Sequence, residues 1–155
     1  MMIFAGHAGI ALIAAYLIKQ DPLLMLIGGV MPDLDAILSI LGANFGKTHR
    51  KITHSIILPI ITGILSIWAP AFIPITIGVL IHFITDMDHW GIPLLYPIIK
   101  DEYSLIKIDH SKSYKTTKEA INEWFKNRDA KFYIEWTLLV IGIILTKEYW
   151  TSLIF

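Results

Sequence analysis

The feature that most constrains this chain is an almost wholly apolar run from residue 56 to residue 84, divided once by Ala69-Pro70-Ala71. A membrane-spanning helix needs about 20 apolar residues, and this run is too long for one such helix. Proline interrupts the hydrogen-bond ladder of a helix. The run is therefore predicted to form two antiparallel helices that turn at Pro70.

A second pair of apolar segments precedes this helical hairpin. Residues 1–18 and 23–43 are separated by Lys19-Gln20-Asp21-Pro22, where Pro22 suits the first turn of the second helix. No Lys or Arg precedes the first segment, whereas a cleaved signal peptide normally begins with basic residues. The first segment is therefore interpreted as a retained membrane helix.

The composition is also typical of a membrane protein. Charged residues make up 17% of the chain and hydrophobic residues 55%, whereas a soluble domain carries roughly 25% charged residues. We expect an all-α fold in one domain, 1–155: a polytopic membrane bundle of about four or five short transmembrane helices. A basic polar insert covers residues 100–131, and the C-terminal helix is expected within residues 133–155.

Histidines and aspartates lie at matching positions on the two hairpins. His7 and Asp35 are equally far in sequence from Asp21, and His54 and Asp86 are equally far from Pro70. Antiparallel helices bring such positions level, about 21–24 Å from each turn for a rise of 1.5 Å per residue. The four groups are thus predicted to meet at one membrane face. Ionisable groups among apolar helices are costly and usually mark function.

The distribution of basic residues predicts the orientation. The face with the polar groups receives Lys47, Arg50, Lys51 and the basic residues of the 100–131 insert, whereas the other face keeps Lys19 and Lys147. Cytoplasmic loops carry an excess of Lys and Arg. The N-terminus and the polar groups are therefore expected on the cytoplasmic side of the inner or plasma membrane.

Four polar clusters could supply metal ligands, and the chain has no cysteine, so the donors would be nitrogen and oxygen. His82 and Asp86, at i and i+4, share one helix face. Each cluster alone has a plainer explanation, as a hydrogen-bonded histidine, a helix cap or a basic loop. Their predicted convergence favours a metal site. The candidate ligands are His7, Asp33, Asp35, His49, His54, His82 and Asp86.

The same blocks resemble the motifs of a known family. Pro32-Asp33-Leu34-Asp35, the segment 49–55, and His82-x-x-x-Asp86 followed by Gly91 and Leu94-Leu95-Tyr96-Pro97 are similar to those of the YdjM-like family, and His7 fits its N-terminal histidine. The family is described as LexA-binding, inner-membrane-associated, metal-dependent hydrolases. The resemblance covers roughly residues 1–97 and implies a small polytopic membrane protein whose histidines and aspartates bind divalent metal.

A hydrolytic mechanism can be formulated for these residues. Mixed imidazole and carboxylate ligands suit Zn, with Mn or Fe as alternatives, better than Ca or Mg. Two or more ions would fit, one to generate hydroxide near neutral pH and another to stabilise the leaving oxygen. Arg50, assisted by Lys51, is predicted to bind a substrate phosphate, while Asp88 or His89 transfers protons. A site at headgroup depth predicts a phosphoester in a membrane lipid.

Two other functions fit the same sequence. The metal could be structural or regulatory in a non-enzymatic membrane protein, with the basic insert as the docking surface for a cytoplasmic protein partner or a second copy of the chain. A metal-ion or proton transporter is favoured less, because the polar groups gather at one face and do not line a path across the membrane. No nucleic acid partner is predicted.

Overall fold

The computed structural model describes residues 4–36, 51–87, 91–105 and 117–154. Within these ranges the chain is helical, with short 3-10 turns and one isolated β-bridge, so the all-α prediction is confirmed. The helices are α1 (Phe4–Ile18), α2 (Pro22–Val30), α5 (Ile57–Trp68), α6 (Phe72–Asp86), α7 (Thr117–Asn127), α8 (Ala130–Leu145) and α9 (Lys147–Ile154), with 3-10 turns η1 (Met31–Asp33) and η2 (Ile52–His54).

Both predicted hairpins are present. The Asp21 carboxylate accepts a hydrogen bond of 2.9 Å from the Leu24 amide and so caps α2, with Pro22 in its first turn. The α5–α6 turn lies at Pro70, as expected, because α5 ends at Trp68 and α6 begins at Phe72. Polar capping and proline therefore place both turns where the apolar pattern predicts them.

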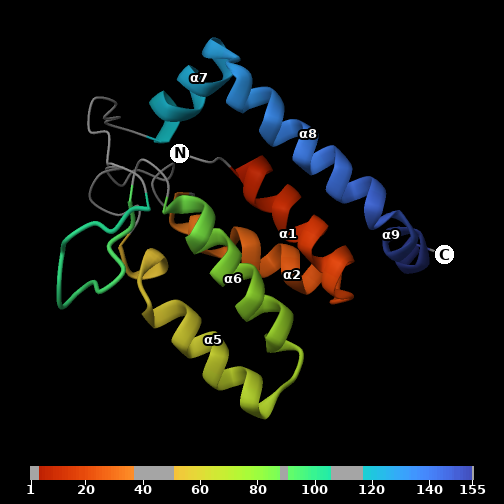
Figure 1. Cartoon of the computed structure of the whole chain (residues 1–155), viewed down its shortest axis with the longest axis horizontal. Helices are drawn as coiled ribbons and strands as arrows, with labels where there is room; N and C mark the ends of the chain where they lie inside the picture. Colours follow the sequence, from red (N-terminus) through yellow and green to blue (C-terminus); the bar gives the residue numbers. More distant parts are fainter. Residues whose placement is uncertain (1–3, 37–50, 88–90, 106–116, 155) are drawn as a thin grey trace.

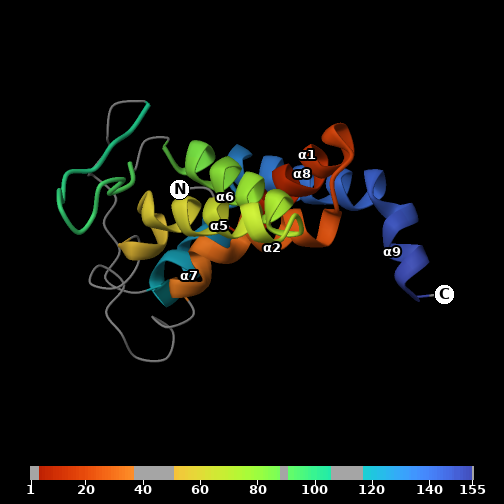
Figure 2. The same ribbon diagram turned by 90° about the horizontal axis from the view of Figure 1, so that it is seen from below.

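The helices pack in order across the molecule. α1 lies between α8 on one side and α2 and α6 on the other, and α5 packs on the outside of α6 (Figure 1). Figure 2 shows α9 and the C-terminus at the end of the bundle opposite η2, α7 and the 91–105 segment. α1 thus has extensive contacts with α8 on one side and with α2 and α6 on the other.

Glycines let the central helices approach closely. A Cβ added at Gly28 in α2 would lie 2.1 Å from the Ile75 carbonyl oxygen of α6, and one added at Gly142 in α8 would lie 2.8 Å from the Leu12 Cβ of α1. Any larger residue would push these helices apart. Small residues at close helix contacts are typical of packing in membranes, where no hydrophobic force draws helices together.

The segment after α6 folds back onto the bundle. Ile92 is fully buried against Val79 and Phe83 of α6, and its backbone pairs with Tyr103 in an antiparallel bridge. The Leu94 carbonyl accepts a hydrogen bond of 2.8 Å from the Ile56 amide, just before α5. The start of this segment thus packs against α6 and closes the bundle near the start of α5.

The C-terminal part differs in detail from the expectation. α8 extends back to Ala130 because the Asp129 carboxylate accepts a hydrogen bond from the Phe132 amide and caps it. The helix then stops at Thr146, and α9 follows as a separate helix. The Tyr149 hydroxyl of α9 contacts both carboxylate oxygens of Asp21 at 3.1 Å, which ties the C-terminus to the α1–α2 turn.

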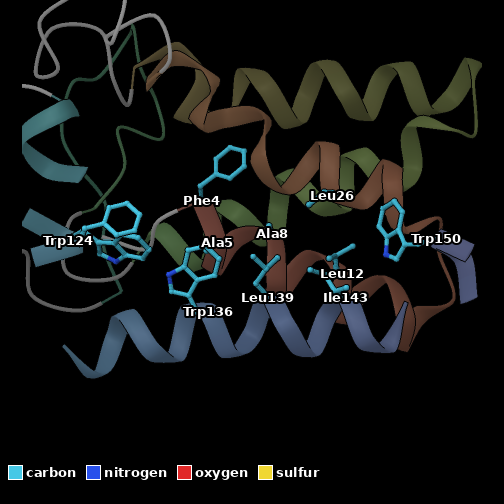
Figure 3. Close-up of a pocket in the computed structure, with 11 residues that line it drawn as sticks. Phe4, Ala5, Ala8, Leu12, Leu26, Trp124, Trp136, Leu139, Ile143 and Trp150 are labelled. Carbon is cyan, nitrogen blue, oxygen red and sulfur yellow. The ribbon is translucent and has the colours of Figure 1, made fainter. Parts of the chain in front are cut away.

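An apolar groove of about 640 Å³ runs along the contact between α1 and α8 (Figure 3). Trp124 and Trp150 lie toward its two ends. Its other lining residues are all apolar or aromatic: Phe4, Ala5, Ala8, Leu12, Leu26, Phe125, Trp136, Leu139 and Ile143. The groove lies on a different face of α1 from His7, whose ring stacks on His82 of α6.

The outer surface of the bundle is apolar, and α5 shows this most clearly. Its Ile67 and Trp68 are 78% and 83% exposed, while its Thr62 is buried and its Ser66 hydroxyl contacts the Thr76 hydroxyl of α6 at 3.1 Å. Polar groups therefore point inward and apolar groups outward. No helix in the described ranges is both long and apolar enough to cross a membrane, so the expected transmembrane spans are not confirmed.

Candidate metal centre

The candidate site is formed where four elements meet at one end of the bundle. His7 comes from α1, Asp33 from η1, His54 from η2, and His82 with Asp86 from the last turns of α6. The side chains of all except Asp33 are at most 1% exposed. The two hairpins thus bring together histidines and aspartates that are far apart in sequence.

Four of these residues can hold one metal ion. Asp33, His54, His82 and Asp86 each offer a ligand atom, and the four atoms lie within 4.8 Å of one another. His54 Nε2 lies 3.6 Å from Asp33 Oδ1 and 3.5 Å from Asp86 Oδ2. His82 Nε2 lies 3.7 Å from the same two oxygens. Two imidazoles and two carboxylates thus surround a single position.

The hydrogen bonds of the two imidazoles assign their tautomers. His82 Nδ1 lies 2.8 Å from the Gly29 carbonyl oxygen, which can only accept, so Nδ1 carries the proton and Nε2 the lone pair. The Thr53 hydroxyl donates to Asp35 at 2.6 Å and therefore accepts from His54 Nδ1 at 3.2 Å. The lone pair of His54 is then also on Nε2.

The two Nε2 atoms face each other at 3.2 Å. With these tautomers both atoms are acceptors, and two buried lone pairs at this distance repel each other unless a cation lies between them. Carboxylate oxygens of Asp33 and Asp86 lie beside both nitrogens. A divalent metal would be bound by all four groups at once, and metal-binding histidines are commonly oriented in this way through their other nitrogen.

The groups around Asp33 keep its carboxyl group ionised, which is the form that binds a metal. Burial alone would raise the pKa of Asp33, but at low pH, where the histidines are protonated, a hydrogen bond from His54 and the positive charges of His82 and His7 outweigh burial and lower that pKa to about 2. Asp33 is therefore ionised at neutral pH. Its side chain is 13% exposed, more than those of its neighbours, so solvent reaches the described part of the site beside Asp33.

The residues predicted from the sequence divide into four groups. His7, Asp33, His54, His82 and Asp86 are brought together by the structure. Asp35 is buried behind His54, 3.8 Å from Nδ1, where it can orient the ring instead of facing the Nε2 atoms. Lys51 immediately precedes η2 and is half-buried. His49, Arg50, Asp88 and His89 lie outside the described residues, so their predicted roles stay predictions.

Sequence reasoning missed the groups that orient the imidazoles. Thr53 adjoins His54, and Thr85 adjoins Asp86 and lies three residues after His82. Hydroxyl residues next to candidate ligands in an apolar helix were the available signal. The third group, the Gly29 carbonyl, has no side-chain signal because any residue supplies a backbone oxygen.

Comparisons with known proteins give one match. The family model of the YdjM inner membrane protein matches residues 1–152, almost the whole chain. No curated protein and no solved structure matches the chain. The match thus extends well beyond the motifs and includes α7, α8 and most of α9.

Proposed function

Because the chain belongs to the YdjM inner membrane protein family, we propose that it is a membrane-bound, metal-dependent hydrolase that cleaves a phosphoester of lipid type. The observation that carries the proposal is the pair of buried imidazoles whose Nε2 lone pairs face each other between two carboxylates. Together with the two carboxylates, this pair offers four ligand atoms around a single position.

The ligand chemistry favours hydrolysis over electron transfer. Histidine and carboxylate ligands suit Zn, with Mn or Fe as alternatives. A bound divalent ion would lower the pKa of a water molecule and polarise a phosphoryl oxygen. Asp33 and Asp86 supply the negative charge that holds the ion, while the Gly29 carbonyl and the Thr53 hydroxyl hold the His82 and His54 rings in position.

The outer surface supports the membrane location. Like α5, α8 has exposed apolar side chains, among them Ile134, Val140 and Ile144. Such broad apolar faces are rare on soluble monomers and are stable in contact with lipid. We propose that these faces contact lipid and that the site lies at headgroup depth, on the cytoplasmic side favoured by the basic residues.

Substrate binding and proton transfer are assigned to residues that lie close to the proposed ligands in the sequence. Arg50 and Lys51 precede η2, which carries His54, so their cations would bind the phosphate. Asp88 and His89 follow α6 and would exchange protons with the attacking water and the leaving oxygen. In the reaction, water attacks phosphorus, the bond from phosphorus to the leaving oxygen breaks, and one water proton ends on that oxygen.

The test is a hydrolysis assay on detergent-purified protein loaded with Zn²⁺ or Mn²⁺. Mixed micelles of phosphatidic acid and phosphatidylglycerol serve as lipid substrates, with bis(p-nitrophenyl) phosphate as the water-soluble substrate. Metal-dependent cleavage of lipid, lost in His82→Ala and kept in Thr76→Val on the same helix, supports the proposal. Cleavage of the soluble ester alone overturns the lipid assignment, and metal binding without any cleavage overturns the hydrolase.

One observation favours a second function. Asp33, His54, His82 and Asp86 could by themselves complete a four-coordinate shell, which is the arrangement of a structural metal. In that case the metal would hold the two hairpins together, and the 100–131 insert would dock a cytoplasmic partner. Loss of thermal stability on metal removal, without hydrolysis of either substrate, would support this function.

A further inference from the structure

In Asp33 and in Asp86, the two oxygens of the carboxylate lie near different histidines. One oxygen of each faces the His54–His82 pair, as described above. The other oxygen faces His7: His7 Nε2 lies 3.3 Å from Asp86 Oδ1 and 3.9 Å from Asp33 Oδ2. Both carboxylates thus extend from the four-ligand position toward a second position in front of His7.

The orientation of His7 matches that of the other two imidazoles. The Thr85 hydroxyl donates to the Ile81 and His82 carbonyls at 3.0 and 2.9 Å, so it accepts from His7 Nδ1 at 2.9 Å. The lone pair of His7 is therefore on Nε2. This atom is buried and has no hydrogen-bond partner among the described residues, although it faces two carboxylate oxygens.

The spacing of the rings fits a pair of metal ions. His7 stacks on His82 with ring centroids 3.8 Å apart and ring planes 25° apart. Nδ1 of His7 is hydrogen-bonded to the Thr85 hydroxyl, and Nδ1 of His82 to the Gly29 carbonyl. The Nε2 atoms of both rings lie beside the carboxylates of Asp33 and Asp86. Metals in two-metal hydrolytic sites lie about 3.5–4 Å apart. Stacked imidazoles at this spacing can each bind one of two neighbouring ions.

We propose that His7 Nε2, Asp33 Oδ2 and Asp86 Oδ1 form a second divalent-metal position, joined to the first by both bridging carboxylates. The first position has four protein donors, whereas the described residues supply three to the second. An incomplete shell leaves room for water or a substrate oxygen, as in catalytic sites. The inference rests on the proposed function and assigns the second position as the one that meets the substrate.

The test is a Mn²⁺ titration of detergent-purified, chelator-stripped protein, with bound metal counted by elemental mass spectrometry and examined by electron paramagnetic resonance. Wild type is expected to bind two equivalents with an exchange-coupled signal. His7→Asn is expected to bind one equivalent with the signal of isolated Mn²⁺. A wild type that binds one isolated equivalent overturns the second position and leaves the proposed function standing. Absence of bound Mn²⁺, Zn²⁺ or Fe²⁺ overturns both.

A second variant keeps the test valid if His7→Asn does not fold. Thr85→Val removes the hydroxyl that accepts from His7 Nδ1 but leaves every proposed ligand in place. Loss of such an orienting group typically weakens metal binding about 10–100-fold. In Thr85→Val we expect this weaker binding for the second metal equivalent alone. The control is Thr76→Val, which is the same substitution on the same helix. Equal affinities of the second equivalent in Thr85→Val and Thr76→Val overturn the proposal.

Discussion

Two faces of α1 pack in opposite ways. One carries His7 into a buried polar cluster with α6, where imidazoles and carboxylates lie within 4 Å of one another. The other contacts α8 through Gly9 and Gly142 and borders an apolar groove. We propose that the first contact depends on a bound cation, which would lie between its imidazole lone pairs and carboxylates, whereas the second needs none. On this proposal the molecule has an ion-dependent half, around His7 and α6, and an ion-independent half, around α8.

His82→Ala should have the largest effect on the ion-dependent half. It removes a ligand to the first metal position and the ring that stacks on His7. Metal affinity should fall by more than the roughly 100-fold upper range seen when only an orienting group is lost. Elemental mass spectrometry on purified protein measures this loss. Retention of stoichiometric metal in His82→Ala would contradict the assigned centre.

Thr53→Val should weaken the same half without removing a ligand. The substitution deletes the hydroxyl that accepts from His54 Nδ1 and donates to Asp35. Metal affinity should fall about 10–100-fold, as measured by competition with a chromophoric chelator. Thr62→Val in α5 is the matched control, since among the described residues the Thr62 hydroxyl donates to carbonyl oxygens of its own helix. Equal affinities of the two variants would argue against an orienting role for Thr53.

Gly28→Ala and Gly142→Ala test whether the two halves of the molecule respond independently to a change in helix packing. Each places a Cβ within 2.8 Å of a neighbouring helix, so each should lower the free energy of unfolding by about 1–3 kcal/mol. Only Gly28→Ala should also weaken metal binding, because it separates α2, which carries the Gly29 carbonyl, from His82. Thermal unfolding in detergent and metal titration measure the two effects.

Gly63→Ala is the control for this pair, because a Cβ there meets no atom within 4 Å. The alanine should leave metal affinity unchanged and stabilise α5 by up to about 1 kcal/mol through its higher helix propensity. If Gly142→Ala weakened metal binding as much as Gly28→Ala, the two halves would not be independent.

Tyr149→Phe should have the smallest effect. It removes the hydroxyl that donates to Asp21 and ties α9 to the α1–α2 turn, far from the metal centre in the bundle. The loss should cost about 1 kcal/mol of unfolding free energy and leave metal content unchanged. A thermal melt of the metal-loaded protein measures the change in stability, and elemental analysis measures the metal content. A change in metal content would mean that the C-terminal contact reaches the centre.

Much of the fold followed from local signals. Asp21-Pro22 predicted the start of α2, and Ala69-Pro70-Ala71 predicted the α5–α6 turn, because capping and proline act within a few residues. The convergence of His7, His54 and Asp86 followed from hairpin symmetry. The start of α8 was predicted too late, since the Asp129 cap precedes the apolar run that marked the helix.

The site could be predicted only as a set of residues. Asp33 and Asp35 looked equivalent in sequence, yet Asp33 faces the imidazole Nε2 atoms and Asp35 lies behind His54. Asp33 is the last residue of η1 and Asp35 lies two residues beyond it, and no pattern in the sequence indicates which carboxylate meets the Nε2 atoms. The tautomers likewise depend on partners from other elements, above all the Gly29 carbonyl.

The sequence alone determined the helical class, the two hairpins and the residue types of the centre, because apolar periodicity, capping and proline are local properties. The tertiary structure decided which atoms meet: the facing Nε2 atoms of His54 and His82, the two-sided carboxylates, and the stacking of His7 on His82. These contacts depend on how closely α1, α2 and α6 approach. That distance is set by glycines whose effect exists only when two helices pack together.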